Sequence, residues 1–154
     1  MKNLIILLLL ALVTTIGCKP KSGVSVATGD AASKVYVAPG TYDEFYNVVS
    51  GGFSGQMAIY GIPSGRLFRE IPVFSADPET GWGYTEETKG MLMTSHGFVP
   101  WDDLHHPALS TTKGIHDGRW AFGNANNTPR IARIDMKTFK TVEIIELPNS
   151  SGNH

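Results

Sequence analysis

A single cysteine, Cys18, limits what this chain of 154 residues can fold into more than any other feature. One thiol cannot form an internal disulfide, so the fold must be held together by its core or by a bound metal. Because Cys18 ends an apolar N-terminal stretch that we expect to be processed, a transition metal in the mature chain must rely on histidine. The chain has five histidines, and imidazole suits copper, zinc, iron and nickel.

Residues 1–18 have the pattern of an export signal, with Lys2 before an apolar run at residues 4–13. The run is shorter than the roughly 20 residues that a membrane-spanning helix needs. Because the segment ends on Gly17-Cys18 rather than on an Ala-x-Ala pattern, it resembles a bacterial lipoprotein signal, although Thr15 stands where leucine is commoner. We expect a lipid anchor at Cys18. The alternative is an ordinary signal peptide with an incidental cysteine.

Residues 19–33 are small and polar, a composition that cannot bury enough apolar area to offset the entropy cost of ordering. We expect a flexible tether there, and one domain over residues 34–154. Across the chain 13 lysines and arginines nearly balance 14 aspartates and glutamates, and no basic run occurs. Nucleic acid is therefore not an expected partner.

Short runs rich in β-branched and aromatic residues, separated by turn-forming residues, dominate the domain. The 17 glycines and 9 prolines also favour many tight turns. We therefore expect an all-β fold with one short helix at residues 42–49. The expected strands cover residues 35–37, 56–62, 67–74, 119–124, 130–136 and 141–147.

A weak internal repeat links two of the expected strand pairs. Ile59, Ile62 and Leu67 recur with the same spacing, 72 residues later, as Ile131, Ile134 and Phe139. Propeller blades are commonly about 40 to 50 residues long, so two blades at this displacement would need an inserted segment between them. Chance similarity of two hairpins is the alternative.

Two histidines stand side by side in the sequence Asp102-Asp103-Leu104-His105-His106-Pro107. Neighbours on a regular strand point to opposite faces, so such a pair can share one metal only where the backbone leaves that geometry. We expect the pair in a loop, with Asp103 placed to accept a ring N–H from a ligand histidine or to act as a local acid or base. The alternatives are a surface pair, or two histidines that only serve a polar loop.

The other histidines carry weaker signals. His154 follows an expected strand and turn, where a chain end is normally frayed. His96 and His116 have no obvious partner in the sequence. Met91 and Met93 could suggest a soft copper site, although methionine more often fills a gap in a core.

Several stretches together resemble the N-terminal part of nitrous-oxide reductase, in the branch exported through the general secretory route. No Arg-Arg pair precedes the apolar run, which agrees with that branch. The resemblance covers residues 34–154, and its motifs are specific. The stretches that carry it are residues 50–56, 95–107, 117–119, 124–134 and 148–149.

The resemblance implies a seven-bladed β-propeller whose hub holds a four-copper sulfide cluster on seven histidines, followed by a cupredoxin domain with a dinuclear copper centre. Under it, His105 and His106 match paired cluster ligands, His154 matches the third, and Asp103 matches the acidic residue beside the cluster. His96 and His116 match no ligand position. The other four ligands, the calcium-binding positions and the cupredoxin domain have no counterpart here. We therefore expect an N-terminal fragment that is inactive on its own.

The resemblance also implies a function, the reduction of nitrous oxide to dinitrogen and water in denitrification. A copper-dependent oxidoreductase of this kind would be periplasmic, would take electrons from a periplasmic donor, and would be a homodimer at full length. Membrane contact would occur only through the lipid anchor. Two alternatives without catalysis stay open: a lipid-anchored propeller-like binding module, and a copper carrier that uses Met91, Met93 and His96 with the histidine pair.

Overall fold

The structure is a computed structural model that describes residues 30–150. Cys18, the expected signal peptide, residues 19–29 and His154 lie outside the described residues. The chain divides into two compact units, one ending at Lys34 and one beginning at Val35. In the first unit the described residues form α2 (Asp30–Lys34), so the end of the expected tether is helical.

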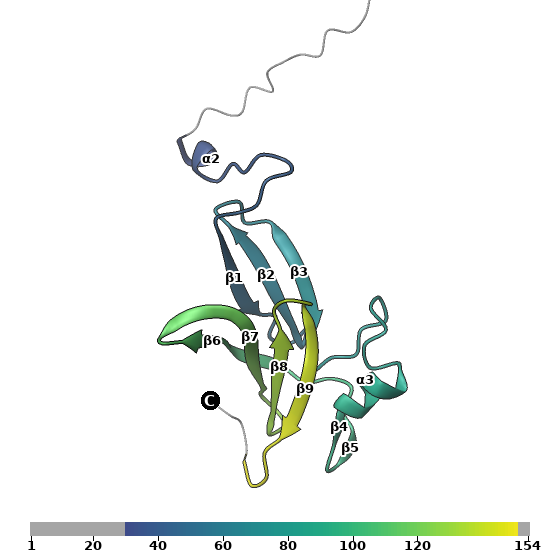
Figure 1. The fold of residues 1–154 in the computed structure, drawn as a ribbon. Coiled ribbons are helices and arrows are strands. Elements are labelled where there is room, and N and C mark those ends of the chain that lie inside the picture. Colours follow the sequence, from purple (N-terminus) through teal and green to yellow (C-terminus); the bar gives the residue numbers. More distant parts are fainter. Residues whose placement is uncertain (1–29, 151–154) are drawn as a thin grey trace, which may run out of the picture. The chain divides into compact units, whose positions relative to one another are not determined.

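The second unit consists mainly of antiparallel sheets, which confirms the all-β class (Figure 1). A three-stranded sheet has the order β1-β2-β3, a four-stranded sheet has the order β6-β7-β8-β9, and a small hairpin joins β4 to β5. The elements are β1 (Phe45–Ser50), β2 (Gln56–Ile62), β3 (Leu67–Pro72), α3 (Glu86–Met91), β4 (Met93–Thr94), β5 (Gly97–Phe98), β6 (Leu104–Thr112), β7 (Ile115–Ala125), β8 (Arg130–Asp135) and β9 (Lys140–Glu146).

Four of the expected strands match β2, β3, β8 and β9, and a fifth falls within β7. The short helix expected at residues 42–49 is wrong, because Phe45–Ser50 pairs along its whole length with β2. Residues 35–37 were expected to be a strand and form none. The structure instead has a helix at Glu86–Met91, where Thr85 caps the N-terminus by accepting from the Thr88 amide.

One hydrophobic core joins the two larger sheets. Met57, Ile59 and Ile71 come from the first sheet, and Leu104, Ala121, Ala132 and Ile134 come from the second. These side chains are between 0% and 1% exposed, so the core fixes the start of β6 firmly against the first sheet.

Both copies of the sequence repeat are antiparallel hairpins, β2–β3 and β8–β9. Four antiparallel strands joined in sequence order, as in β6 to β9, are also the unit that propellers repeat around a ring. Within residues 30–150, no helix is long and apolar enough to cross a membrane.

Candidate metal centre

The histidine pair lies at the beginning of β6, so the expectation of a loop is wrong. The strand is nevertheless irregular there, because its register against β7 shifts between His105 and Ala108. His106 has a φ of 44°, in the left-handed region that non-glycine residues rarely adopt. The ring centroids of His105 and His106 lie 5.6 Å apart at an interplanar angle of 79°. The bulge therefore brings together two rings that a regular strand would send to opposite faces.

Asp103 contacts the first ring of the pair. Its Oδ2 lies 3.1 Å from Nε2 of His105, and the Asp103 side chain is 7% exposed while that of His105 is 31% exposed. The other carboxylate oxygen, Oδ1, is buried and has no hydrogen-bond partner in the described part of the chain. A buried acceptor without a partner beside two imidazoles is typical of a site that a water, a proton or an ion completes.

These residues fit part of a copper site. Bonds from a metal to imidazole nitrogen are about 2 Å long, so two ring centroids on one ion lie at most roughly 6.5 Å apart. The observed 5.6 Å is within that limit. Among residues 30–150, however, no group of three or more His, Cys, Asp or Glu side chains could hold a metal. The pair is therefore part of a donor set, and His154, the third expected ligand, lies outside the described residues.

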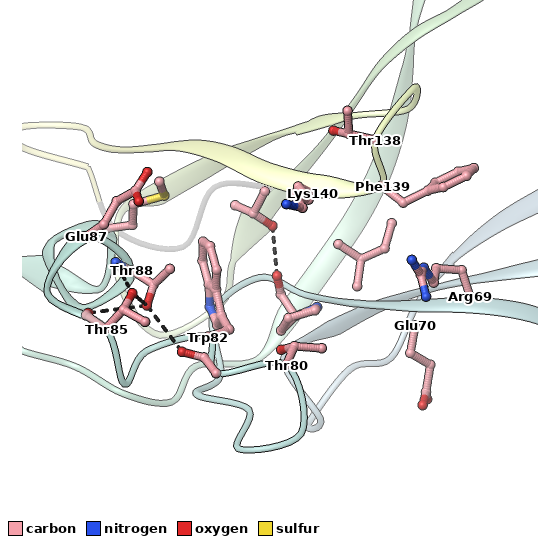
Figure 2. Close-up of a pocket in the computed structure, with 15 residues that line it drawn as sticks. Arg69, Glu70, Thr80, Trp82, Thr85, Glu87, Thr88, Thr138, Phe139 and Lys140 are labelled. Atoms are coloured by element: carbon pink, nitrogen blue, oxygen red, sulfur yellow. Dashed lines mark hydrogen bonds between the residues drawn. The ribbon is translucent and has the colours of Figure 1, made fainter.

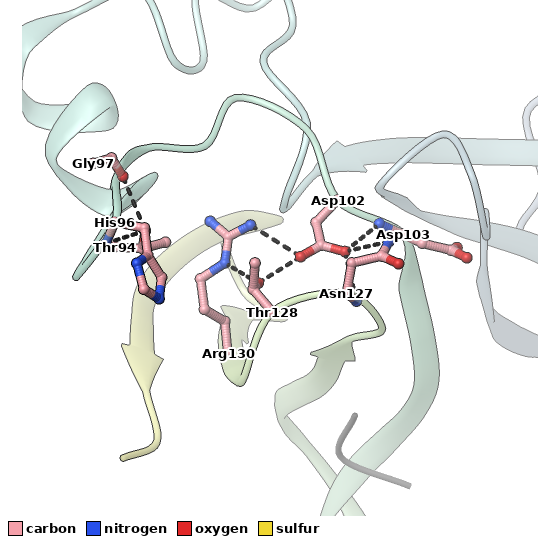
Figure 3. A network of polar contacts seen from close by, with 8 residues as sticks. All are labelled: Thr94, His96, Gly97, Asp102, Asp103, Asn127, Thr128 and Arg130. Carbon is pink, nitrogen blue, oxygen red and sulfur yellow. Dashed lines mark hydrogen bonds and ion pairs between the residues drawn. The ribbon is translucent and has the colours of Figure 1, made fainter. Parts of the chain in front are cut away.

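Asp102, immediately before Asp103, is a fully buried carboxylate with an exposed fraction of 0% (Figure 3). Its Oδ1 accepts from the Asp103 amide at 2.8 Å, and from the amide and side-chain nitrogens of Asn127 at 3.0 Å each. Its Oδ2 accepts from the Thr128 hydroxyl. Burial alone would raise the pKa of Asp102, but the hydrogen bonds from Thr128 and Asn127 outweigh it and hold the pKa below its usual value.

Arg130 is the buried counterion of Asp102. Its side chain is also 0% exposed, and its Nη2 lies 3.3 Å from Asp102 Oδ2. Its Nε donates to the Thr128 hydroxyl at 2.7 Å. The guanidinium lies 5.2 Å from the centroid of the Phe74 ring. Burial lowers the pKa of Arg130. The hydrogen bond to Asp102 and the negative charge of that carboxylate act in the opposite direction and raise it. An arginine stays charged in proteins, so this is an ion pair inside the core.

The loop between β1 and β2 packs against the same place. The Leu104 amide donates to the carbonyl of Gly52 at 3.0 Å, and the Ser50 hydroxyl donates to the carbonyl of Leu104. The indole of Trp101 stacks on Phe53 at 6.2 Å and donates from Nε1 to the Phe53 carbonyl at 2.7 Å. Residues 50–56, 95–107 and 124–134, which carry the sequence resemblance, thus meet around Asp102.

A glycine is required at one point of this contact. Gly55 has a φ of 66°, and a Cβ atom there would lie 2.6 Å from the carbonyl oxygen of Asp102 and 2.0 Å from Oγ of Ser75. Only a residue without a side chain fits between the loop and the start of β6.

Within the described residues, His96 and His116 do not belong to any group of three or more His, Cys, Asp or Glu side chains that could hold a metal. His96 is exposed on the turn between β4 and β5, and His116 is exposed on β7 opposite Thr111. Met93 is 51% exposed. Met91 lines a cavity of about 310 Å³ between β3, α3 and the β8–β9 hairpin, together with Trp82 and Phe139 (Figure 2).

Sequence reasoning proposed Asp103 and the histidine pair as site residues and did not single out Asp102 or Arg130. Both stand in stretches that carry the resemblance, which was the one available signal. Nothing in the local sequence shows that two charges 28 residues apart are buried together.

Comparison with known proteins found no matching family model. The chain is similar to the nitrous-oxide reductase of Pseudomonas fluorescens, with 40% identity over 130 residues, covering 84% of this chain and 20% of that protein. It is 38% identical over 128 residues to the nitrous-oxide reductase of Stutzerimonas stutzeri, covering 83% of this chain and 20% of that protein. With the nitrous-oxide reductase of Cupriavidus necator the identity is 39% over 138 residues, covering 88% of this chain and 22% of that protein. The chain thus spans about a fifth of the length of these curated relatives.

Proposed function

The chain belongs to the nitrous-oxide reductase family, and from that premise we propose that it carries part of the copper site at which nitrous oxide is reduced to dinitrogen and water. The observation that supports this most directly is the bulge of β6, which holds His105 and His106 with ring centroids 5.6 Å apart. A regular strand would separate the two rings, so the irregular backbone is what allows both imidazoles to serve one site.

In this proposal His105, His106 and His154 hold copper. Reduced copper, when bound, supplies electrons to nitrous oxide and polarises it for cleavage of its N–O bond. The residues of this chain keep the ligands in place and handle protons. Asp103 Oδ2 fixes the ring of His105 through Nε2, which determines the ring's orientation and tautomer. The reaction also consumes two protons, and the buried Asp103 Oδ1 is a suitable atom to carry a proton to the departing oxygen.

The wider assembly is part of the same proposal. The four-stranded sheet β6 to β9 is one blade of a seven-bladed propeller, and the site is completed by four further histidine ligands. The sulfide-bridged four-copper cluster, a dinuclear copper centre and calcium belong to the whole protein. It is a periplasmic homodimer that receives electrons from a periplasmic donor, and Cys18 carries a lipid anchor.

The full-length protein with both His105→Ala and His106→Ala tests this function. We expect the variant to lose copper from the site and to lose nitrous-oxide turnover, because two of the ligands are gone. Copper per chain is measured by elemental analysis, and turnover by the consumption of nitrous oxide with a reduced dye as electron donor.

The matched control changes His96→Ala and His116→Ala, which removes two exposed imidazoles outside the pair. This variant should retain both copper and turnover. Wild-type copper content and activity in the His105→Ala/His106→Ala variant would end the proposal and leave the binding module as the better interpretation.

A further inference from the structure

Asp102 has no task in the function proposed above, although it is the most extensively bonded carboxylate next to the histidine pair. We propose that Asp102 is a positioning residue for the pair: its buried Oδ1 fixes the backbone of Asp103, and through it the carboxylate that holds the His105 ring. This inference rests on the proposed function only in taking the pair as a copper site.

The first step is the backbone around Asp103, which is held on both sides. Its amide donates to Asp102 Oδ1 at 2.8 Å, and its carbonyl accepts from the Asn126 amide at 3.0 Å. The next amide, that of Leu104, donates to the Gly52 carbonyl at 3.0 Å. Because both neighbouring peptide groups are fixed, the Asp103 side chain starts from a defined position, and its Oδ2 reaches His105 at 3.1 Å.

The second step is the turn that faces Asp103. Asp102 Oδ1 also accepts from both nitrogens of Asn127, so one oxygen ties residues 126–128 to the start of β6. An ionised carboxylate is suited to this, because its oxygens only accept hydrogen bonds. Without that oxygen, the buried amide of Asp103 and the two partly buried nitrogens of Asn127 would lose their partner at once.

The third step is that the two carboxylate oxygens of Asp102 have different roles. Oδ1 accepts hydrogen bonds from the backbone amides of Asp103 and Asn127 and from the Asn127 side chain. Oδ2 accepts from the Thr128 hydroxyl and balances the charge of Arg130. Asparagine at position 102 would keep an acceptor at Oδ1 and lose the negative charge. Positioning and charge balance can therefore be tested independently.

Two double variants of the full chain, as the cell produces it, make this separation. Asp102→Asn with Arg130→Met keeps the Oδ1 acceptor, and Asp102→Ala with Arg130→Met removes it. Neither variant buries an unpaired charge, and replacing a buried ion pair by apolar groups is often tolerated. The control is Asp135→Asn, since Asp135 also accepts a backbone amide, that of Lys137, and a threonine hydroxyl, that of Thr138, at a turn in another part of the sheet.

Two measurements follow. Competition titration gives the affinity for Cu(II), and nitrogen NMR of the His105 ring in the metal-free chain reports its tautomer and hydrogen bonding. We expect the alanine double variant to bind Cu(II) about tenfold more weakly than the asparagine double variant, and its His105 signals to change. The asparagine double variant and Asp135→Asn should keep the wild-type His105 signals.

Equal affinities and equal His105 signals in the two double variants overturn the positioning role. If both double variants lose the same amount of Cu(II) affinity, the positioning role is overturned as well, because the effect would then belong to the Asp102–Arg130 charge pair. If the wild type does not bind Cu(II) but only the alanine double variant changes the His105 signals, the copper function fails and the positioning role of Asp102 stands.

Discussion

The two ends of the β6–β7 hairpin use the same chemistry in different surroundings. At the turn end, Asp117 accepts from the hydroxyls of Ser110 and Thr112 and from the Arg119 amide, and Ile115 is 74% exposed. At the other end, Asp102 also accepts hydroxyl and amide donors, but it is fully buried with Arg130. Hydrogen bonds alone thus do not distinguish the two ends. Burial does, because it makes each partner costly to remove.

The largest difference in stability between the two ends is expected when Arg130→Ala is compared with a matched change at the exposed end. Removal of one partner of a buried ion pair typically costs about 3–5 kcal/mol of stability, because the other charge stays buried and unpaired. The comparison variant is Arg119→Ala at the exposed end. Urea denaturation measures both, and similar unfolding free energies for the two variants would show that the Asp102–Arg130 pair is not desolvated as the structure describes.

Leu104→Ala tests the packing at the buried end. Leu104 is 0% exposed in the core between the sheets, so we expect a loss of about 2–5 kcal/mol. Ile115→Ala is the matched change at the other end of the same strand pair and should stay within about 0.5 kcal/mol of the wild type. Equal midpoints of thermal unfolding for these two variants would contradict the burial of the β6 start.

The buried end should also contribute to the dependence of stability on pH. The folded-state pKa of Asp102 lies below its ordinary value of 3.8, because hydrogen bonds from Thr128 and Asn127 outweigh burial. The unfolded chain therefore binds the proton more readily, so this carboxylate contributes stability above its unfolded pKa and loses it as the pH falls through the folded pKa. Urea midpoints from about pH 6 to about pH 3 should decline in the wild type. The decline should be shallower in Asp102→Asn, and unchanged slopes would contradict this assignment.

Asp117→Asn should give the smallest effect. Hydrogen bonds from Ser110, Thr112 and the Arg119 amide lower the pKa of Asp117, but the group lies in an exposed turn where water can replace a lost partner. We expect the variant to have a midpoint of thermal unfolding close to that of the wild type, and to bind copper as the wild type does. A large drop in either quantity would mean that the turn end is not independent of the histidine pair.

Most of the strands could be predicted from the sequence because turn residues separate them. Pro63-Ser64-Gly65 between β2 and β3 and Lys137-Thr138 between β8 and β9 are clear turn signals. Strand β1 was mistaken for a helix because its state is decided by pairing with β2, which local preference does not show. Strand β6 was taken as a loop because the bulge at His106 interrupts any regular alternation.

The contact between Asp103 and His105 was expected from their separation of two residues, and the structure has it at 3.1 Å. The burial of Asp102 with Arg130 could not be predicted. It depends on how the turn of residues 126–130 lies against the start of β6, and this is set by the register of β7 and β8 and by the contact with the first sheet.

The stack of Phe53 on Trp101 gives this protein a natural optical reporter. Trp101, the residue next to Asp102, is 47% exposed and contacts the β1–β2 loop. Trp82, in contrast, is 7% exposed, and the centroid of the Trp120 ring lies 4.7 Å from the Arg133 guanidinium. With Trp82→Phe and Trp120→Phe, the fluorescence of the remaining indole would follow the loop as it detaches. Local opening beside the histidines could then be recorded separately from the melting of the sheets.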